Sequence, residues 1–143
     1  IVEGLSYRVG YAKQAAGIDN EDDETRYSAS LGYKYQISSD LSAKLLAEHM
    51  DIDHLGGEAA HNRAYSTAAL RLDYQQWNLG TSYTYINNDA EEEDENHDGN
   101  VFQISAGYSF ENGIGLDVGY QRSDEENEVT NRIGALISYS HEF

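Results

Sequence analysis

The sequence predicts an all-β fold, an eight-stranded antiparallel up-and-down barrel that crosses a membrane. Three observations predict this fold. Apolar and polar residues alternate with period two in eight segments, which is typical of strands that turn one face to lipid and the other to the interior. The connections between these segments alternate between short and long. Aromatic residues collect at the segment ends, where a membrane protein meets lipid headgroups.

The composition fits a barrel once hydropathy is considered segment by segment. The mean hydropathy of −0.69 and the lack of an apolar run of about 20 residues exclude a membrane-spanning helix. Barrel strands, in contrast, alternate their apolar residues with polar ones. The chain has no Cys, which excludes disulfides and thiol metal sites, and no Pro, which would interrupt a ladder. Its 143 residues predict one domain over 1–143.

The first three segments place their odd-numbered residues on the face that we expect to meet lipid. These outward positions lie within 5–11, 27–37 and 41–47. The first two segments alternate cleanly between apolar or aromatic residues and small or polar ones. The third is less regular, because Leu46 and Met50 fall on the inward face. All three are nevertheless predicted as strands, since period two is the spacing of one strand face.

The remaining five segments continue the same alternation. The fourth places the even-numbered residues of 68–74 outward, and the fifth follows almost at once with the odd-numbered residues of 77–85. The sixth and seventh use the even-numbered residues of 102–110 and 114–120. The last uses the odd-numbered residues of 133–143 and ends on an aromatic residue. An even number of strands returns both ends of the chain to the same rim.

The connections define two different rims. Tight turns are predicted at 38–40, 75–76 and 111–113. Longer polar loops are predicted at 17–25, 53–63, 87–100 and 123–130. By analogy with transmembrane barrels, in which turns are short on the periplasmic side and loops long on the outside, we expect the long loops to be extracellular.

The aromatic residues are predicted to form two girdles around an aliphatic band. The chain has 12 Tyr, 3 Phe and 1 Trp, and Tyr suits headgroup depth because its ring is apolar and its tip polar. The girdle residues are Tyr33, Tyr35, Tyr74, Trp77, Tyr83, Tyr85, Phe110, Tyr120, Tyr139 and Phe143. The alternative is a soluble sandwich or lipocalin-like barrel, which would have little reason to sort its aromatic residues by height.

Acidic residues give the chain a formal net charge of −17 and concentrate in the long loops. Such a rim gathers cations and repels anionic macromolecules over a distance that salt limits to about 8–10 Å. An equally good interpretation is that the acidic residues only keep the loops solvated. Nucleic-acid binding is disfavoured, because phosphate contacts need basic patches.

One loop contains the opening of a calcium motif. Asp94, Asn96 and Asp98 precede a Gly in the pattern Asp-x-Asn-x-Asp-Gly, in which alternate oxygen side chains converge on the ion. The twelfth position, where an EF-hand supplies a bidentate Glu, is Ser105. Two interpretations therefore stay open: calcium as a cofactor of the 87–100 loop, or a solvated acidic loop.

The inward face of the segments collects charged and polar residues among many Gly and Ser. They are Arg8, Lys34, Lys44, Glu48, Arg71, Asp73, Asp117, Gln121 and Arg132. Charges in a low-dielectric interior need partners, so we expect Arg71 to pair with Asp73 and Asp117, and Lys44 with Glu48. The same groups would line a narrow water path. Eight strands leave an interior that side chains nearly fill, but Gly and Ser fill it poorly.

Histidines beside acids raise the question of an enzyme. The candidates are His49, Asp51, Asp53, His54 and His61, since a His next to a carboxylate can orient a water for proton transfer. The sequence has no nucleophile elbow, and the same residues serve equally as polar rim groups. We therefore predict no catalytic residues and no enzymatic activity.

The segments 107–120 and 133–143 resemble the closing hairpins of Gram-negative porins. The terminal Phe143 resembles the signal by which the barrel-assembly machinery recognises its clients. This resemblance implies location in the cell outer membrane, contact with the lipid bilayer and lipopolysaccharide, and small solutes as permeants. General porins have about 16 strands, so eight strands resemble small OmpA/OmpX-type barrels instead. The chain is then either a complete small barrel or half of a larger porin.

Two functions follow as hypotheses. The first is a porin-like barrel that acts as a narrow passive pore or as a membrane-stabilising scaffold. The second is a surface interaction or adhesion module, whose acidic extracellular loops bind calcium or another partner while the barrel serves as an anchor. Deleting residues 90–98 separates the two, because a pore should survive this deletion and a loop-based binder should not.

Overall fold

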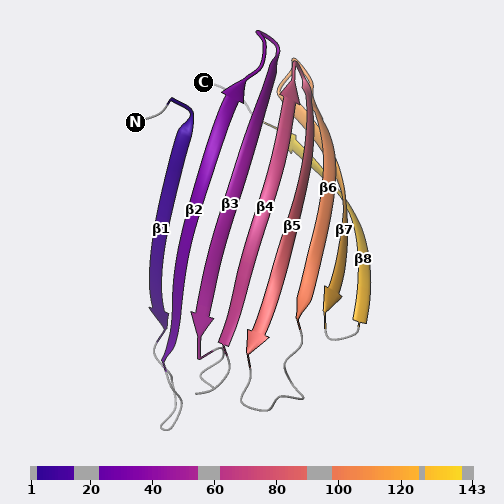
Figure 1. The fold of residues 1–143 in the computed structure, drawn as a ribbon. Coiled ribbons are helices and arrows are strands. Elements are labelled where there is room, and N and C mark those ends of the chain that lie inside the picture. Colours follow the sequence, from indigo (N-terminus) through magenta and orange to yellow (C-terminus); the bar gives the residue numbers. More distant parts are fainter. Residues whose placement is uncertain (1–2, 15–22, 55–61, 90–97, 126–127, 140–143) are drawn as a thin grey trace.

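The computed structural model describes residues 3–14, 23–54, 62–89, 98–125 and 128–139. These residues form one antiparallel sheet in which each of eight strands pairs with its neighbours in sequence (Figure 1). The strands are β1 (Leu5–Gln14), β2 (Glu24–Gln36), β3 (Leu41–Asp53), β4 (Asn62–Tyr74), β5 (Trp77–Asp89), β6 (Gly99–Ser109), β7 (Ile114–Glu125) and β8 (Glu128–Tyr139). The predicted all-β, up-and-down fold class is confirmed.

The three predicted tight turns are present. Between β2 and β3 the Ile37 amide donates to the Leu41 carbonyl at 2.9 Å, and between β6 and β7 the Phe110 amide donates to the Ile114 carbonyl at 2.7 Å. Gln75, between β4 and β5, has a φ of 50°, and Gly113 has a φ of 83°. A left-handed residue closes a tight turn, and Gly adopts that conformation without steric cost.

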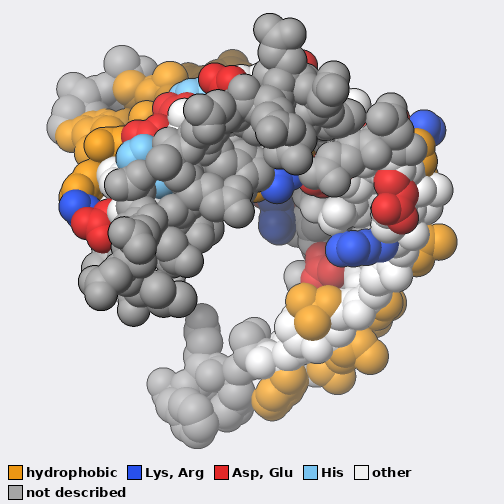
Figure 2. All heavy atoms as spheres, turned by 90° about the horizontal axis from the view of Figure 1, so that it is seen from below, with side chains coloured by type: hydrophobic (Ala, Val, Ile, Leu, Met, Phe, Trp, Pro, Cys, Tyr) orange, Lys and Arg blue, Asp and Glu red, His pale blue; other side chains and the backbone are white. Residues whose placement is uncertain are grey.

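One ion pair identifies the concave face of the sheet. Arg63 of β4 and Glu125 of β7 lie 2.7 Å apart, although β5 and β6 separate their strands. A contact across two intervening strands is possible only where a curled sheet turns its concave side inward. Alternation then assigns Arg71 and Asp73 of β4 to the same side. The inward face predicted from the sequence is therefore the concave face, and the space-filling view in Figure 2 shows that the molecule is hollowed.

The two edge strands, β1 and β8, are not paired with each other among the described residues. Closure of the curled sheet into a barrel therefore stays a prediction. No helix within the described ranges is long and apolar enough to span a membrane.

Several predicted loops are shorter than expected, and the last is wrong. β5 continues to Asp89 and β4 begins at Asn62. The predicted 123–130 loop is largely a hairpin, because Ser123 pairs with Thr130 and Glu125 with Glu128. Only residues 126–127 connect β7 to β8. The hydrogen bonds between strands are formed by backbone N–H and C=O groups. Charged residues can therefore extend a strand as readily as apolar residues once its pairing with the neighbouring strand is fixed.

The apolar side chains lie outside this sheet rather than in a core. Ile52 and Ile86 are the only buried hydrophobic residues in the described part of the chain. Val9 and Ile137, in contrast, are 77% and 75% exposed. A soluble sandwich buries one apolar face of each sheet, and this sheet does the opposite. Exposed apolar surface of this extent indicates contact with lipid or protein.

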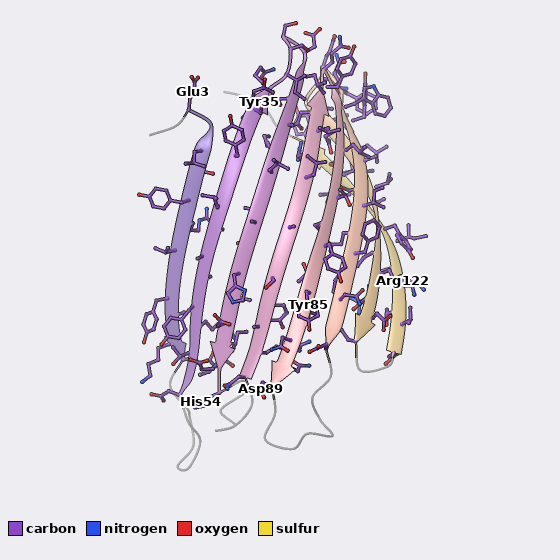
Figure 3. The ribbon with its side chains drawn as sticks, in the orientation of Figure 1. Glu3, Tyr35, His54, Tyr85, Asp89 and Arg122 are labelled. Carbon is purple, nitrogen blue, oxygen red and sulfur yellow. The ribbon has the colours of Figure 1, made fainter. Side chains whose placement is uncertain are left out.

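Two of the predicted girdle residues, Tyr35 and Tyr85, lie at different heights on the sheet. Tyr35 lies near the tight-turn end and Tyr85 toward the long-loop end (Figure 3). The register places Tyr74 opposite Trp77, and the rings of Trp77 and Tyr108 contact each other edge to face with centroids 4.7 Å apart. Phe143 lies outside the described residues. That these rings meet lipid headgroups stays a prediction.

Candidate functional site

The concave face carries a row of three cations on one wall and small residues on the other. The register places Lys34, Lys44 and Arg71 next to one another across β2, β3 and β4. At the same height β5 to β8 contribute Gly80, Ser105, Gly119 and Gly134. Side chains at directly opposed positions of neighbouring strands lie about 5 Å apart. The row of three cations on β2 to β4 therefore continues into a row of small side chains on β5 to β8.

Asp73 compensates two of these cations. Its carboxylate accepts from Arg71 Nε at 2.7 Å and lies 3.1 Å from Lys44 Nζ. The predicted Arg71–Asp73 pair is confirmed, but Lys44 contacts Asp73 rather than the predicted partner Glu48. Glu48 lies four residues along the same strand, which is about 13 Å at 3.3 Å per residue. A spacing of four brings side chains together on a helix, not on a strand.

Asp117 contacts Asn78 rather than Arg71, the partner predicted from the sequence. The Asn78 side-chain amide donates to Asp117 Oδ1 at 3.4 Å, across the intervening strand β6. A glycine makes this crossing possible, because a Cβ at Gly107 would lie 2.1 Å from Asp117 Oδ1. The Asp117 side chain thus passes over Gly107 of β6 and bonds to Asn78 of β5. Arg71, the predicted partner, lies one strand further, on β4.

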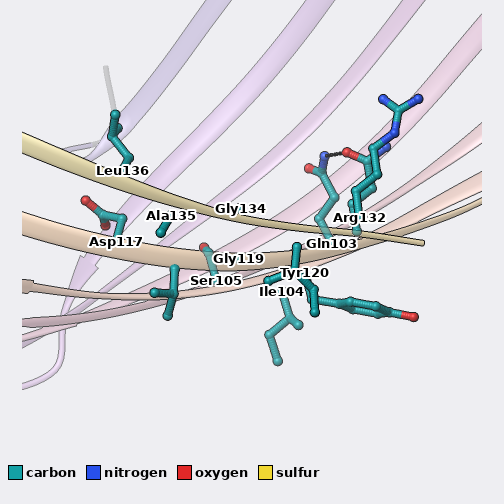
Figure 4. Close-up of a pocket in the computed structure, with 13 residues that line it drawn as sticks. Gln103, Ile104, Ser105, Asp117, Gly119, Tyr120, Arg132, Gly134, Ala135 and Leu136 are labelled. Carbon is teal, nitrogen blue, oxygen red and sulfur yellow. Dashed lines mark hydrogen bonds between the residues drawn. The ribbon is translucent and has the colours of Figure 1, made fainter. Parts of the chain in front are cut away.

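A chain of side-chain amides follows the next row of the concave face. Ser82 donates to Gln103 Oε1 at 3.0 Å, and the Gln103 amide donates to Gln121 Oε1 at 2.9 Å. Arg132 is the register partner of Gln121 and lines a cavity of about 480 Å³ with it (Figure 4). These polar groups can bind water or a solute along the interior.

Arg8 and Glu48 complete the predicted interior residues. The register connects them through Ser30, since Arg8 pairs with Ser30 and Ser30 with Glu48. They therefore occupy one row on the concave side, two same-face positions closer to the long-loop end than Lys34. The predicted inward residues are thus on one face, although only some of them contact one another.

The histidines lie elsewhere. His49 Nδ1 is 2.9 Å from Ser66 Oγ, and its Nε2 is 3.2 Å from Asp51. Alternation places these three residues on the convex face. They are the residue types of a hydrolase triad, but both strands are paired throughout in the β3–β4 ladder. Backbone N–H groups are a common source of oxyanion stabilisation in acyl transfer, and those of this ladder already form interstrand hydrogen bonds.

The remaining rim candidates form no metal site in the described ranges. The His54 amide donates to Asn62 Oδ1 at 3.2 Å, and Asp53 is the register partner of Thr25. Asp98 accepts a hydrogen bond from the Tyr85 hydroxyl. Within the described residues no group of three or more His, Cys, Asp or Glu is placed to hold a metal. His61, Asp94 and Asn96 lie outside the described residues.

The sequence reasoning missed the Arg63–Glu125 pair. Both residues were assigned to loops, at 53–63 and 123–130, because of their charge. A signal was available, since Arg63 continues the odd-numbered inward positions of β4 and Glu125 those of β7. Extending the alternation past the first charged residue would have placed both on the concave face.

A family model described as Gram-negative porin matches residues 2–142. Comparison with curated proteins and with solved structures gives no match.

Proposed function

We propose that this chain, which belongs to the Gram-negative porin family, forms a narrow passive pore for small solutes in the outer membrane. The family match extends over nearly the whole chain. It indicates a channel or structural protein of the outer membrane rather than an enzyme. The pore is a finer assignment, and the concave face supports it.

The observation that carries the proposal is the contrast between the two walls of the interior. β2 to β4 present Lys34, Lys44 and Arg71 in one row, while β5 to β8 present only Gly and Ser at the same height. A purely structural barrel of eight strands would fill its interior with side chains. Small residues leave space there, and the charged row keeps that space wetted.

The scaffold alternative predicts a different interior. A scaffold gains stability when its buried charges are fully compensated. Here Asp73 contacts Lys44 and Arg71, and Lys34 lies next to Lys44 in the same row. Together the four groups carry a formal charge of two positive units. Unbalanced charge is costly in a dry interior and inexpensive in a hydrated one. The charge balance therefore favours a hydrated interior.

Single-channel recording in a planar bilayer tests the proposal. The refolded chain is expected to give discrete conductance steps, and Arg71→Ala together with Asp117→Ala should alter their size. The matched control is His49→Ala, on the convex face, which should leave the steps unchanged. A silent bilayer with folded, inserted protein would support the scaffold instead.

Calcium binding by the third acidic loop is a second candidate function. The Asp-x-Asn-x-Asp-Gly pattern of residues 94–99 supports it. Titration calorimetry with Ca²⁺ should show heat that is lost when residues 90–98 are deleted. Titration with Mg²⁺ controls for general attraction of divalent ions to the acidic rim. Equal heats for both ions, or for the deletion variant, would leave only a solvated acidic loop.

A further inference from the structure

One ion pair crosses the interior at the long-loop end. The Arg63 guanidinium donates to Glu125 Oε2 at 2.7 Å, from β4 to β7. The side chains are 20% and 36% exposed, less than the Arg71 side chain in the middle of the sheet, which is 52% exposed. The bridge therefore spans β5 and β6 in a more enclosed part of the concave face.

A residue without a side chain, Gly99 of β6, makes the crossing possible. A Cβ at Gly99 would lie 2.7 Å from Glu125 Cγ, closer than a Cβ normally approaches another atom. Gly99 is buried and is the register partner of Ile86 on β5. The Glu125 side chain thus runs over the bare backbone of Gly99 on its way to Arg63. Gly107 plays the same part for Asp117 at the other end of β6.

The ion pair lies next to the most deeply buried side chains in the described part of the molecule. Ile52, Ile86 and Asn88 are 5%, 3% and 7% exposed. Ile52 and Asn88 are the register partners of Arg63 on either side. The guanidinium also lies 5.3 Å from the centroid of the Tyr65 ring, within cation–π range. This end of the concave face is therefore more enclosed than its middle, where the residues of β5 to β8 are small.

Glu125 is the principal counter-charge of Arg63. Arg63 Nε is buried and has no hydrogen-bond partner in the described residues, so the guanidinium depends on Glu125 and on the Tyr65 ring. A part-buried charge that loses its partner is strongly disfavoured. Partial burial of both side chains therefore favours the paired state of Arg63 and Glu125.

We propose that the Arg63–Glu125 bridge is a latch across the long-loop entrance of the interior, and that ion flow is limited by how often it opens. The inference rests on the proposed pore. With the latch closed, two side chains span the passage above Ile86. With it open, the carboxylate swings toward the cation Arg132, which lines a polar cavity of about 300 Å³ together with Glu125. The entrance is then free of the bridging side chains.

The test compares single-channel records of the full chain with Arg63→Ala, Glu125→Gln and the charge-reversed pair Arg63→Glu with Glu125→Arg. Removing a charge-assisted contact should raise the ratio of open to closed time by about tenfold in each single variant. The reversed pair should restore brief openings, because it rebuilds the bridge. Lys13→Ala is the matched control, since Lys13 forms an exposed pair with Asp23 at 2.6 Å.

The outcomes separate the latch from the pore. Wild-type steps with unchanged gating in all variants would overturn the latch and leave the pore intact. Silence in every variant, with folding confirmed by circular dichroism, would overturn both proposals. A silent wild type with a conducting Arg63→Ala variant would support both. Equal effects of Lys13→Ala and Arg63→Ala would assign the change to rim charge and contradict the latch.

Discussion

At the scale of single residues, Asp73 shows how side chains of one strand and of its neighbour meet on the concave face. Asp73 contacts Arg71 on its own strand and Lys44 on the next. Both contacts follow from period two, because positions i and i+2 share a face and a neighbouring strand supplies the diagonal. Sequence reasoning found the i, i+2 pair and missed the diagonal one, since the register between strands is not visible in one sequence.

We expect Asp73→Asn to make the pore more selective for anions. Among the described residues, Asp73 is the carboxylate that contacts the Lys44 and Arg71 side chains, so its loss leaves three cations in one row. The substitution should also lower the free energy of unfolding by about 1–2 kcal/mol, since charged hydrogen bonds are lost. The reversal potential in a KCl gradient measures the selectivity. A shift toward cations would contradict the assignment of this row to the conducting path.

We expect Gly99→Ala to be costly and Gly134→Ala to be harmless. An added methyl at Gly99 meets Glu125, whereas a Cβ at Gly134 has no atom within 4 Å. Overpacking typically costs about 1–3 kcal/mol, which urea unfolding in lipid vesicles can measure. Gly99→Ala should also open the channel as Arg63→Ala does. Equal stability of the two variants would show that Glu125 has another route to Arg63.

At the scale of elements, the number and order of the strands could be predicted, and the strand ends at the long-loop rim could not. The tight turns were correct because Gln75, Gly113 and their neighbours separate two strict alternations. The long-loop ends were misjudged because charge was interpreted as the end of a strand. Hydrogen bonds of the ladder belong to the backbone, so Glu125 and Glu128 pair as well as apolar residues do.

The β7–β8 hairpin allows a direct test of this correction. Replacing residues 126–127 by Asn-Gly should preserve or improve folding, because Asn-Gly favours the two-residue turn that joins antiparallel strands. Inserting four Gly residues at the same place should do no more than lengthen the loop. Gel mobility of unheated and heated samples reports folding in each case. Loss of the folded band with Asn-Gly would mean that a tight turn does not fit here.

At the scale of the whole molecule, the distribution of apolar residues is inverted relative to a soluble domain. Val9, Leu31 and Ile137 are more than half exposed on the convex face, and buried hydrophobic residues in the described ranges are confined to Ile52 and Ile86. This inversion fits membership of the Gram-negative porin family, because lipid covers the apolar band of outer-membrane barrels. The sequence predicted the band and a barrel, but not the particular contact that joins β4 to β7.

Trp77 offers a direct measure of how the molecule lies in a bilayer. It is the only Trp in the chain and is 58% exposed at the start of β5. We expect lipids brominated near the headgroup to quench its fluorescence more than lipids brominated near the bilayer centre, because interfacial rings sit at headgroup depth. Transfer of the probe to Leu79 by Trp77→Phe with Leu79→Trp should reverse the order.

Single-channel conductance of the refolded chain is the most direct test of a conducting interior. We expect small, discrete steps that change when Arg71 and Asp117 are replaced by Ala and that become more frequent when Arg63 is replaced. Both changes must occur in protein that shows the strand content and Trp77 quenching of the wild type. A bilayer that stays silent with such protein, in every variant, would contradict the claim that the concave face of this sheet conducts.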